Sequence, residues 1–464
     1  MTATGIAPTV KGWCPGALRP MESGDGLIVR LRIAAGIADP ALAARIADWS
    51  RRWGNGLIDL SNRANLQMRG VARRHLPDLW DALRNAGLLD ASEAAEAVRN
   101  VVCSPLAGLD PDAVLDIRPI VRALGQRLAG DTTLHTLPGK FGFAIGDGGM
   151  FGAGGAFADI RFEARRTADG PVFDIHLAGA PDWRLGPCRP AALSDVAADL
   201  ATAFLRLRTG QQANLYPDEP PAMPDPPMYD GRTRPHGDRF GIRRMRDLTA
   251  AYGAEAVAQA AGLALCPSLP AKHRARPADF LGAHRLGSNA FAGVGLRFGR
   301  IGADDLAALA AAAAANGAET LRLTPWRAIL VPVPSVADAH RLIAALPAGS
   351  FILDPDDPIL RVAACPGAPA CHCAAAPVRD AAASLAAAVA SAPGSGIVLH
   401  VSGCEKGCAH PRPAPFTLVG RDGYFDLIRD GVASAEPASR RLTLAQAAAH
   451  IQRIAATGRE QDSA

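Results

Sequence analysis

Arg361-Val-Ala-Ala-Cys365-Pro-Gly-Ala-Pro-Ala-Cys371 joins two features of this 464-residue chain, an arginine that leads a strand-like run and a pair of cysteines. A second pair, Cys404-Glu-Lys-Gly-Cys408, follows after a stretch that reads as one helix. Four thiolates are what an iron–sulfur cube needs, and sulfur ligands favour such clusters or zinc over harder metals. The Gly- and Pro-rich C-x5-C spacing is wider than the tight knuckle typical of structural zinc. The quartet Cys365, Cys371, Cys404 and Cys408 therefore predicts a cluster ahead of zinc or unligated thiols.

The arginine-led segment has an earlier counterpart, Arg99-Asn-Val-Val-Cys103-Ser-Pro-Leu-Ala-Gly108. The blocks around the two segments also match, which indicates an internal duplication. Before the segment, strand, helix, strand and helix are expected over 26–33, 40–53, 56–63 and 75–86. They are expected again over 293–298, 303–316, 320–327 (with 329–332) and 337–346. After it come a helix and a pair of strands, over 140–145 and 159–164 in the first copy and over 396–401 and 416–419 in the second. Such blocks are typical of ferredoxin-like units, and two related halves predict a pseudo-twofold axis with a cleft between them.

Composition limits the class of protein. With 49% hydrophobic and 20% charged residues, a soluble globular protein of several domains is expected. The net charge of +4 gives no argument for nucleic acid. Nine cysteines in a chain of this length fit a reducing compartment better than a disulfide framework. No signal-like leader is recognised at Met1–Lys11 and the apolar runs are short and rich in alanine, so we expect a cytoplasmic protein without a membrane span.

Polar residues in the first copy could bind an anionic ligand. On a strand, alternate side chains share one face, and four polar ones alternate here: Arg63, Asn65, Gln67 and Arg69. Two guanidiniums and two amides on one face predict a polyanion-binding surface, with a solvated outer face as the alternative. Arg99 and Lys140 begin two further segments and would converge with this face only in the duplicated fold.

Other candidate residues have weaker signals. Five histidines could serve as iron ligands or acid–base groups, with structural or surface roles as the alternative: His236, His284, His372, His400 and His410. Cys373 could be a spare thiol or a substitute ligand, while Cys103, Cys188 and Cys266 are expected to be small buried residues. The Gly-rich run 146–155 lacks the Lys-Ser/Thr ending of a nucleotide loop and is expected to join two strands.

From Gly12 to about Gly431, the duplicated layout with C-x5-C and Gly-Cys-x3-Cys resembles the sulfite and nitrite reductase superfamily. In that superfamily the quartet holds a [4Fe–4S] cluster beside a tetrapyrrole. The resemblance implies anion- or tetrapyrrole-binding roles for Arg63, Arg99 and Lys140. Its reductases usually carry a second lysine two residues after the first, where this chain has Gly142.

The opening segment from Gly12 to Arg30 and the motif Leu323-Thr-Pro-Trp-Arg327 look like the precorrin-3B synthase branch of the superfamily. The resemblance implies an α+β fold with duplicated ferredoxin-like half-domains, two α/β sandwich domains and a pseudo-twofold axis. The expected parts are a first half-domain (12–90), a first reductase-like domain (91–215), a Pro-rich linker (216–240), a second half-domain (241–350), an iron–sulfur domain (351–455) and a flexible tail (456–464).

This branch implies a monooxygenase that hydroxylates precorrin-3A at C20 and closes a γ-lactone in cobalamin biosynthesis. Oxygen would be activated at a mononuclear non-haem iron, and electrons would come from NADH through a redox partner and the cluster. The expected catalytic residues are Arg63, Arg99 and Lys140, and the expected substrate-binding residues are Asn65, Gln67, Arg69 and Arg327. The iron ligands are left unassigned, with His410 and His236 suggested only by their places beside motifs.

Two alternatives remain. The first is a sirohaem-dependent sulfite or nitrite reductase, against which Gly142 and the opening segment argue. The second is a non-catalytic tetrapyrrole-binding protein with a structural four-cysteine zinc site, which predicts zinc without iron.

Overall fold

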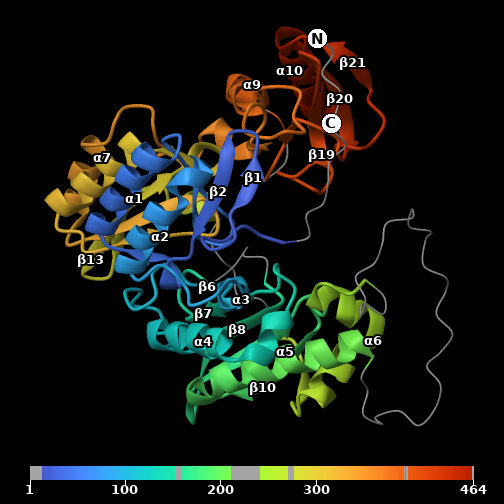
Figure 1. Cartoon of the computed structure of the whole chain (residues 1–464). Helices are drawn as coiled ribbons and strands as arrows, with labels where there is room; N and C mark the ends of the chain where they lie inside the picture. The colour runs from blue at the N-terminus through green and yellow to red at the C-terminus, as the bar shows by residue number, and fades with distance from the viewer. Residues whose placement is uncertain are drawn as a thin grey trace. The chain divides into compact units, whose positions relative to one another are not determined.

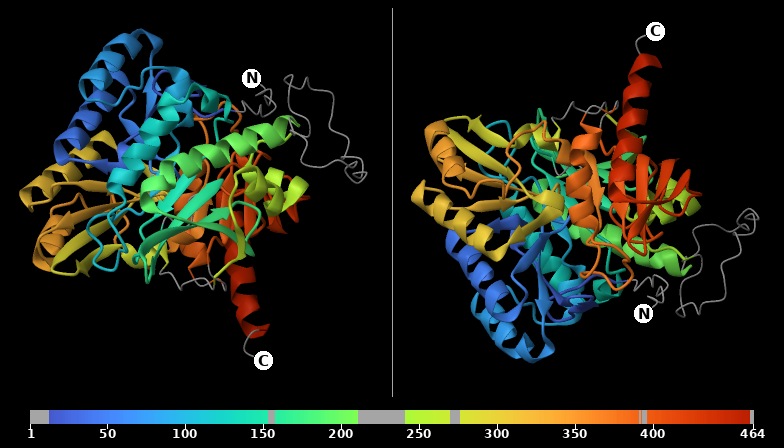
Figure 2. Two further views of the ribbon diagram at one scale, coloured as in Figure 1. Left: turned by 90° about the horizontal axis from the view of Figure 1, so that it is seen from below. Right: turned by 90° about the horizontal axis from the view of Figure 1, so that it is seen from above.

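The computed structural model describes residues 13–152, 158–210, 241–269, 276–390, 392 and 396–461 (Figures 1 and 2). The chain divides into two compact units, one formed by Met1–Leu89 with Ala275–Ala464 and the other by Asp90–Arg274. The expected second half-domain, 241–350, therefore starts too early, because residues 241–274 belong to the unit Asp90–Arg274. The Pro-rich linker 216–240 lies outside the described residues.

The first unit contains both ferredoxin-like half-domains. The first half-domain places α1 (Pro40–Trp53) and α2 (Leu76–Asn85) on strands β1 (Met21–Ser23), β2 (Gly26–Leu31), β4 (Leu57–Leu60) and β5 (Leu66–Val71). The second places α7 (Ala303–Ala315) and α8 (Val336–Ala344) on β12 (Gly282–Leu286), β13 (Asn289–Gly295), β15 (Leu321–Leu323) and β16 (Ala328–Val333). Helix α1 starts where the sequence predicts, because Asp39 accepts the Leu42 N–H at 2.6 Å and proline occupies the first helical position.

The two half-domains exchange a short strand. Strand β14 (Arg300–Gly302) follows the second half's β13 but pairs with β4 of the first half, and β3 (Ile37–Ala38) of the first half pairs with β15 of the second. Each half thus completes the five-stranded sheet of the other. Both sheets bury their apolar faces in one shared core, with α1 packed on α7 (Figure 1).

The duplication extends to unusual backbone conformations. Ala35 and Gly36 have φ angles of 55° and 67° just before β3, and Phe298 and Gly299 have φ angles of 52° and 73° just before β14. A positive φ is uncommon outside glycine, so its recurrence at matching places is strong evidence for a common origin of the two halves. The expected α+β fold with duplicated halves is confirmed.

The cysteine quartet belongs to a domain at the end of the first unit. Its sheet runs through β17 (Val362–Ala364), β18 (Leu399–Ser402), β19 (Ala414–Arg421), β20 (Tyr424–Gly431) and β21 (Ser439–Leu442). Strands β17, β18 and β19 are parallel and the rest antiparallel. Helices α9 (Val378–Leu385) and α10 (Leu444–Gln461) pack against this sheet. The expected tail 456–464 is wrong at its start, because α10 continues to Gln461.

The second unit, Asp90–Arg274, holds one six-stranded sheet. Its strands are β6 (Val101–Cys103), β7 (Phe143–Gly146), β8 (Ile160–Thr167), β9 (Gly170–Leu177), β10 (Trp183–Cys188) and β11 (Leu265–Pro267), and its helices are α3 (Glu93–Val98), α4 (Arg118–Gly130), α5 (Leu193–Thr209) and α6 (Met245–Ala260). Strand β11 pairs with β10, which fixes residues 265–267 to this unit. In the described ranges, no helix combines the length and apolar character needed to cross a membrane.

Candidate functional site

A row of polar side chains crosses one face of the first half-domain's sheet. Arg30 on β2 lies opposite Gln67 on β5, Gln67 lies opposite Asp59 on β4, and Asp59 lies opposite Arg300 on β14. Arg30 donates to the Gln67 side-chain oxygen at 2.8 and 3.2 Å, and Arg300 Nε donates to Asp59 at 2.8 Å. Alternate residues on the same strands face the shared core. We call Arg30, Gln67, Asp59 and Arg300 the polar row.

The matching row of the second half-domain has lost this character. It consists of Gly293, Leu330, Arg322 and Ile37 in the same ladder positions. A Cβ atom on Gly293 would lie 1.7 Å from the carbonyl oxygen of Phe280, so main chain covers this face directly. The two copies therefore differ in that only the first presents a continuous polar row.

Asp59 is the point where three arginines meet. Its Oδ1 accepts from Arg300 Nε at 2.8 Å and Arg379 Nη1 at 3.0 Å, and its Oδ2 accepts from Arg69 Nη1 at 3.1 Å. Burial disfavours the Asp59 carboxylate, but the guanidiniums of Arg379, Arg300 and Arg69 outweigh it and hold the pKa of Asp59 well below its usual range. Burial lowers the pKa of Arg379 to about 10, so Arg379 and Asp59 are both charged at neutral pH.

Arg69, expected to bind substrate, is committed to protein contacts. It is 2% exposed, and its Nε and Nη2 donate to Asp25 at 2.8 Å each. Its Nη2 also donates to Ser23 Oγ at 3.1 Å and to the carbonyl oxygen of Ala370 at 2.8 Å. All three guanidinium nitrogens are thus engaged, one of them on the cysteine segment, and the substrate-binding role of Arg69 stays a prediction.

The other predicted residues of this unit lie around the polar row. Arg63 and Asn65 are buried, but they precede β5 in a turn where Ala64 has a φ of 54°, so the expected single strand from Arg63 to Arg69 is wrong. In the second copy Arg327, with a φ of 65°, has a similar place before β16. Burial lowers the pKa of Arg327 while Asp59 raises it, which shows that Arg327 lies within electrostatic range of Asp59.

Sequence reasoning missed several charged residues of this face. Arg30 and Arg32 are 7% and 5% exposed, and Arg30 Nη1 is buried without a hydrogen-bond partner. Asp59 and Arg379 were also not singled out. A usable signal was present in Arg30-Leu-Arg32, where two arginines alternate at the end of an otherwise apolar strand.

The four cysteines gather beyond the ends of two neighbouring parallel strands. Cys365 directly follows β17, and Cys404 follows β18 by two residues. Cys365 is buried, Cys371 and Cys404 are half-buried, and Cys408 is the most exposed. Partial burial raises the pKa of the Cys408 thiol, Lys406 lowers it, and the thiols of Cys365, Cys404 and Cys371 raise it further. All four sulfur atoms are therefore near enough to influence one another.

The contacts of these thiols are those of possible metal ligands. Within the described part of the chain, no three His, Cys, Asp or Glu side chains are grouped closely enough to hold one metal ion. Gly403 N–H donates to Cys365 Sγ at 3.3 Å, a contact suited to a thiolate. Burial raises the pKa of Cys365, the backbone hydrogen bonds from Gly403 and Gly367 lower it, and the thiols of Cys371 and Cys404 raise it again. The net pKa is raised, so binding iron would release the proton of Cys365.

The duplicated position in the second unit carries serine. The Ser104 N–H donates to the Ile145 carbonyl at 3.1 Å, as the Cys365 N–H donates to that of Val401 at 3.3 Å. The Asp147 N–H donates to Ser104 Oγ at 3.1 Å, in the same way as the Gly403 N–H donates to Cys365 Sγ. Ser104 is thus the counterpart of Cys365. Counting from the leading arginines Arg99 and Arg361, which would put Cys103 opposite Cys365, is therefore out by one residue.

Asp147 beside Ser104 predicts a pH-dependent stability. Its Oδ1 accepts from Ser104 Oγ at 2.9 Å, while its fully buried Oδ2 has no partner. Burial raises the pKa of Asp147 to about 6. Because the folded protein favours the protonated acid, protonation of Asp147 stabilises the fold. This contribution to the free energy of unfolding is complete below about pH 4 and is lost as the pH rises through 6. We expect Asp147→Asn to raise the free energy of unfolding at pH 8 by up to about 3 kcal/mol.

Urea unfolding of the full chain from pH 4 to pH 8 would measure this difference. The gain from Asp147→Asn should shrink toward pH 4. An equal effect at both ends of the range would contradict the assignment of the shifted acid.

Two predicted catalytic residues belong to the second unit. Arg99, between α3 and β6, pairs with Asp90 through two contacts of 2.8 Å. Lys140 is exposed in the turn before β7. Gly142, two residues further on, donates its N–H to Asp159 at 3.0 Å. These contacts place each residue within Asp90–Arg274 and leave their catalytic roles as predictions.

The histidines do not form an iron site among the residues described here. His400 on β18 is fully buried with neither ring nitrogen hydrogen-bonded, and burial lowers its pKa to about 4. The His410 ring lies 5.9 Å from it between centroids. His284 bonds the Leu281 carbonyl at 2.8 Å, His372 is exposed, and His236 lies outside the described residues. No residue set for a mononuclear iron is therefore assigned.

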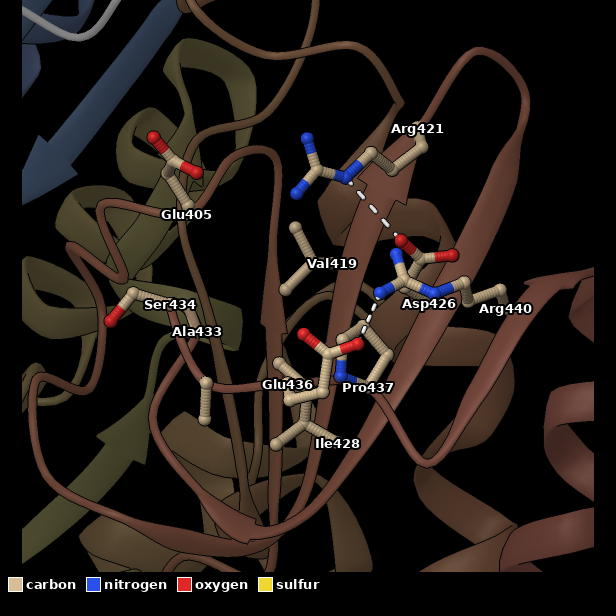
Figure 3. Close-up of a pocket in the computed structure, with 11 residues that line it drawn as sticks. Glu405, Val419, Arg421, Asp426, Ile428, Ala433, Ser434, Glu436, Pro437 and Arg440 are labelled. Carbon is tan, nitrogen blue, oxygen red and sulfur yellow. Dashed lines mark hydrogen bonds and ion pairs between the residues drawn. The ribbon is translucent and has the colours of Figure 1, made fainter.

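A pocket of about 210 Å³ lies on β19 and β20 and reaches Glu405 of the second cysteine segment (Figure 3). Its charges pair with each other, since Arg421 meets Asp426 at 3.4 Å and Arg440 meets Glu436. Pockets for drug-sized ligands are typically about 300–1,000 Å³. This pocket is too small for a tetrapyrrole.

Comparison with known proteins shows the family to which the chain belongs. The model of the nitrite/sulfite reductase ferredoxin-like half domain matches residues 19–86 and 284–348. That of the nitrite and sulphite reductase 4Fe-4S domain matches 94–192, the copy that carries Ser104. A precorrin-3B synthase of Sinorhizobium sp is 30% identical over 94% of this chain and 87% of its own length. The chain belongs to the precorrin-3B synthase branch of the nitrite and sulfite reductase family.

A further relative supports this branch's place in the family, and a solved structure shares the fold. The ferredoxin–nitrite reductase of Synechococcus elongatus is 27% identical over 87% of this chain and 77% of its own length. The NirA protein of Mycobacterium tuberculosis has the same fold, with a TM-score of 0.68, 21% identity and coverage of 92% and 80% of the two chains. As a member of this family the protein is an oxidoreductase, and its 4Fe-4S domain supports an iron–sulfur cluster.

Proposed function

We propose that the protein is an oxygen-dependent precorrin-3B synthase of cobalamin biosynthesis in the cytoplasm. It would hydroxylate precorrin-3A at C20 and close a γ-lactone with a ring A acetate. One atom of O2 enters the product and the other leaves as water, with two electrons from NADH supplied through a redox partner. The observation that carries this proposal is the polar row, in which Arg30 and Asp59 are buried, together with buried Arg32. Arg69 joins this row to the cysteine segment, since it donates to both Asp59 and the Ala370 carbonyl oxygen.

The residues have distinct proposed parts in this reaction. A [4Fe–4S] cluster on Cys365, Cys371, Cys404 and Cys408 would supply one electron at a time. Guanidiniums bind carboxylates through paired, charge-assisted hydrogen bonds, so buried Arg30 and Arg63 and half-buried Arg327 are suited to hold acetate or propionate groups. Asn65 and Gln67 would add amide contacts, and Arg99 and Lys140 keep their predicted catalytic roles. Fixing the macrocycle in one orientation is what selects C20.

The oxygen-activating iron has no ligand set among the described residues, so no step is assigned to it. Iron analysis of the purified protein tests the requirement directly. The monooxygenase predicts more than four irons per chain and a broad iron–sulfur absorption without sharp porphyrin-type bands.

The deciding experiment supplies precorrin-3A, NADH, a reductase partner and 18O2 to the purified protein. We expect a product that carries one 18O atom, and an Arg30→Ala variant that binds precorrin-3A about 10–100-fold more weakly, as the loss of a charged hydrogen-bond pair implies. Bound isobacteriochlorin with nitrite or sulfite reduction would instead establish the reductase, despite Gly142. Stoichiometric zinc without iron would establish the non-catalytic alternative.

A further inference from the structure

We infer that Asp59 and Arg69 are positioning residues for the [4Fe–4S] cluster, because they tie the cysteine segment to the first half-domain and set the charge beside it. This inference rests on the cluster assignment of the proposed function. It concerns residues on strands β4 and β5, far in sequence from the four cysteines.

The first link is made at the residue before Cys371. The carbonyl oxygen of Ala370 accepts from Arg69 Nη2 at 2.8 Å and from Ser23 Oγ at 2.5 Å. The turn between β1 and β2 lies directly on the same segment, since a Cβ on Gly24 would be 2.1 Å from the Pro369 oxygen and 3.1 Å from the Cys371 nitrogen. A cysteine whose neighbouring peptide is held at two points has little freedom to move its sulfur.

The second link is made after the cysteine pair. Arg379 projects from the first turn of α9, and its Nη1 donates to Asp59 Oδ1 at 3.0 Å. Arg379 Nε is buried without a hydrogen-bond partner, so Asp59 is the carboxylate that compensates this cation. Since Arg69 also binds Asp59, one carboxylate restrains the chain on both sides of Cys371.

Charge gives the network a second effect. Asp59 offsets the guanidiniums of Arg69, Arg300 and Arg379 in a buried setting, where a unit charge acts more strongly than in water. Removing its negative charge leaves additional positive charge near the cysteine segment. Positive charge favours the reduced, more negative cluster, so the reduction potential should rise.

The test uses Asp59→Asn in the full-length protein with its cluster. We expect a more positive midpoint potential in an EPR-monitored titration and several-fold faster loss of iron to a chelator. Asp174→Asn is the matched control, because Asp174 is similarly buried and pairs with Arg165 and Arg184 at 2.7 and 2.8 Å, but in the other unit. This control should leave the potential unchanged.

Arg69→Lys separates the two effects and serves if Asp59→Asn does not fold. It retains the charge but loses the fork that reaches both Asp59 and Ala370, so iron loss should accelerate while the potential stays near that of the parent. Unchanged iron loss in this variant, or an unchanged potential in folded Asp59→Asn, overturns the inference. Absence of a cluster from the parent protein would instead refute the proposed function.

Discussion

Exchange of Cys404 for serine should leave a folded protein with neither a [4Fe–4S] cluster nor cluster-dependent activity. A cube requires four thiolates, and a serine hydroxyl at this half-buried position is a far poorer ligand for iron. The core beneath the segment is built from β17, β18 and α9 rather than from the thiol itself, which is why the fold should survive. Iron and sulfide analysis together with visible absorption would measure the loss.

Cys373→Ser is the matched control for this prediction. Cys373 is half-buried like Cys404 and lies two residues from Cys371, yet it is not one of the proposed ligands. It should retain full iron content. Normal iron in Cys404→Ser, combined with loss in a double variant that also lacks Cys373, would show that Cys373 is the fourth ligand.

Replacement of Asp159 by alanine should lower the free energy of unfolding of the unit Asp90–Arg274 by about 3–5 kcal/mol, the cost of breaking a buried ion pair. Asp159 is fully buried and accepts from Arg244 Nε and Nη2, each at 2.9 Å. It also accepts the Met245 N–H at 2.8 Å and the Gly142 N–H at 3.0 Å. The change therefore leaves the Arg244 guanidinium and the main-chain N–H groups of Met245 and Gly142 without this hydrogen-bond acceptor. It also removes a contact that holds the turn carrying Lys140.

Denaturant unfolding of Asp159→Ala should be compared with that of Asp195→Ala. Asp195 pairs with Arg127 at 3.4 Å while its side chain is 76% exposed, and surface pairs contribute only about 0–1 kcal/mol. Similar losses in the two variants would mean that Arg244 and the main-chain donors find other partners.

Local signals in the sequence predicted the parts of the fold that depend on neighbouring residues. Helix α1 was expected over 40–53 and lies there, because its cap, its proline and its apolar stripe are all within the segment. The exchanged strands β3 and β14 could not be predicted, since segments of two and three residues show no periodicity and their partners lie in the other half-domain. The place of β11 and α6 was missed for the same reason, because their contacts cross the Pro-rich linker.

The candidate site shows the same limit. Alternation correctly predicted that Gln67 and Arg69 share a face of β5, but nothing local could show that Arg69 would contact Ala370. The order of residues after Arg99 and Arg361 suggests Cys103 as the counterpart of Cys365. The hydrogen bonds of the Ser104 main chain and side chain show instead that Ser104 occupies the equivalent position. The sequence indicated which residues could carry charge or bind a metal. The contacts that each of these residues makes depend on packing between segments that are distant in the sequence.

The exchange of β3 and β14 has a consequence for synthesis on the ribosome. The first half-domain leaves the exit tunnel before β14, and residues 90–274 must be made before the strand that pairs with β4. At about 5–20 residues per second, this interval is on the order of 10–40 s. During that time the nascent first half-domain exposes an unpaired strand edge and its share of the common core. Until β14 is made, the edge at β4 is open to pairing with strands of other chains, so the newborn chain is prone to aggregate there.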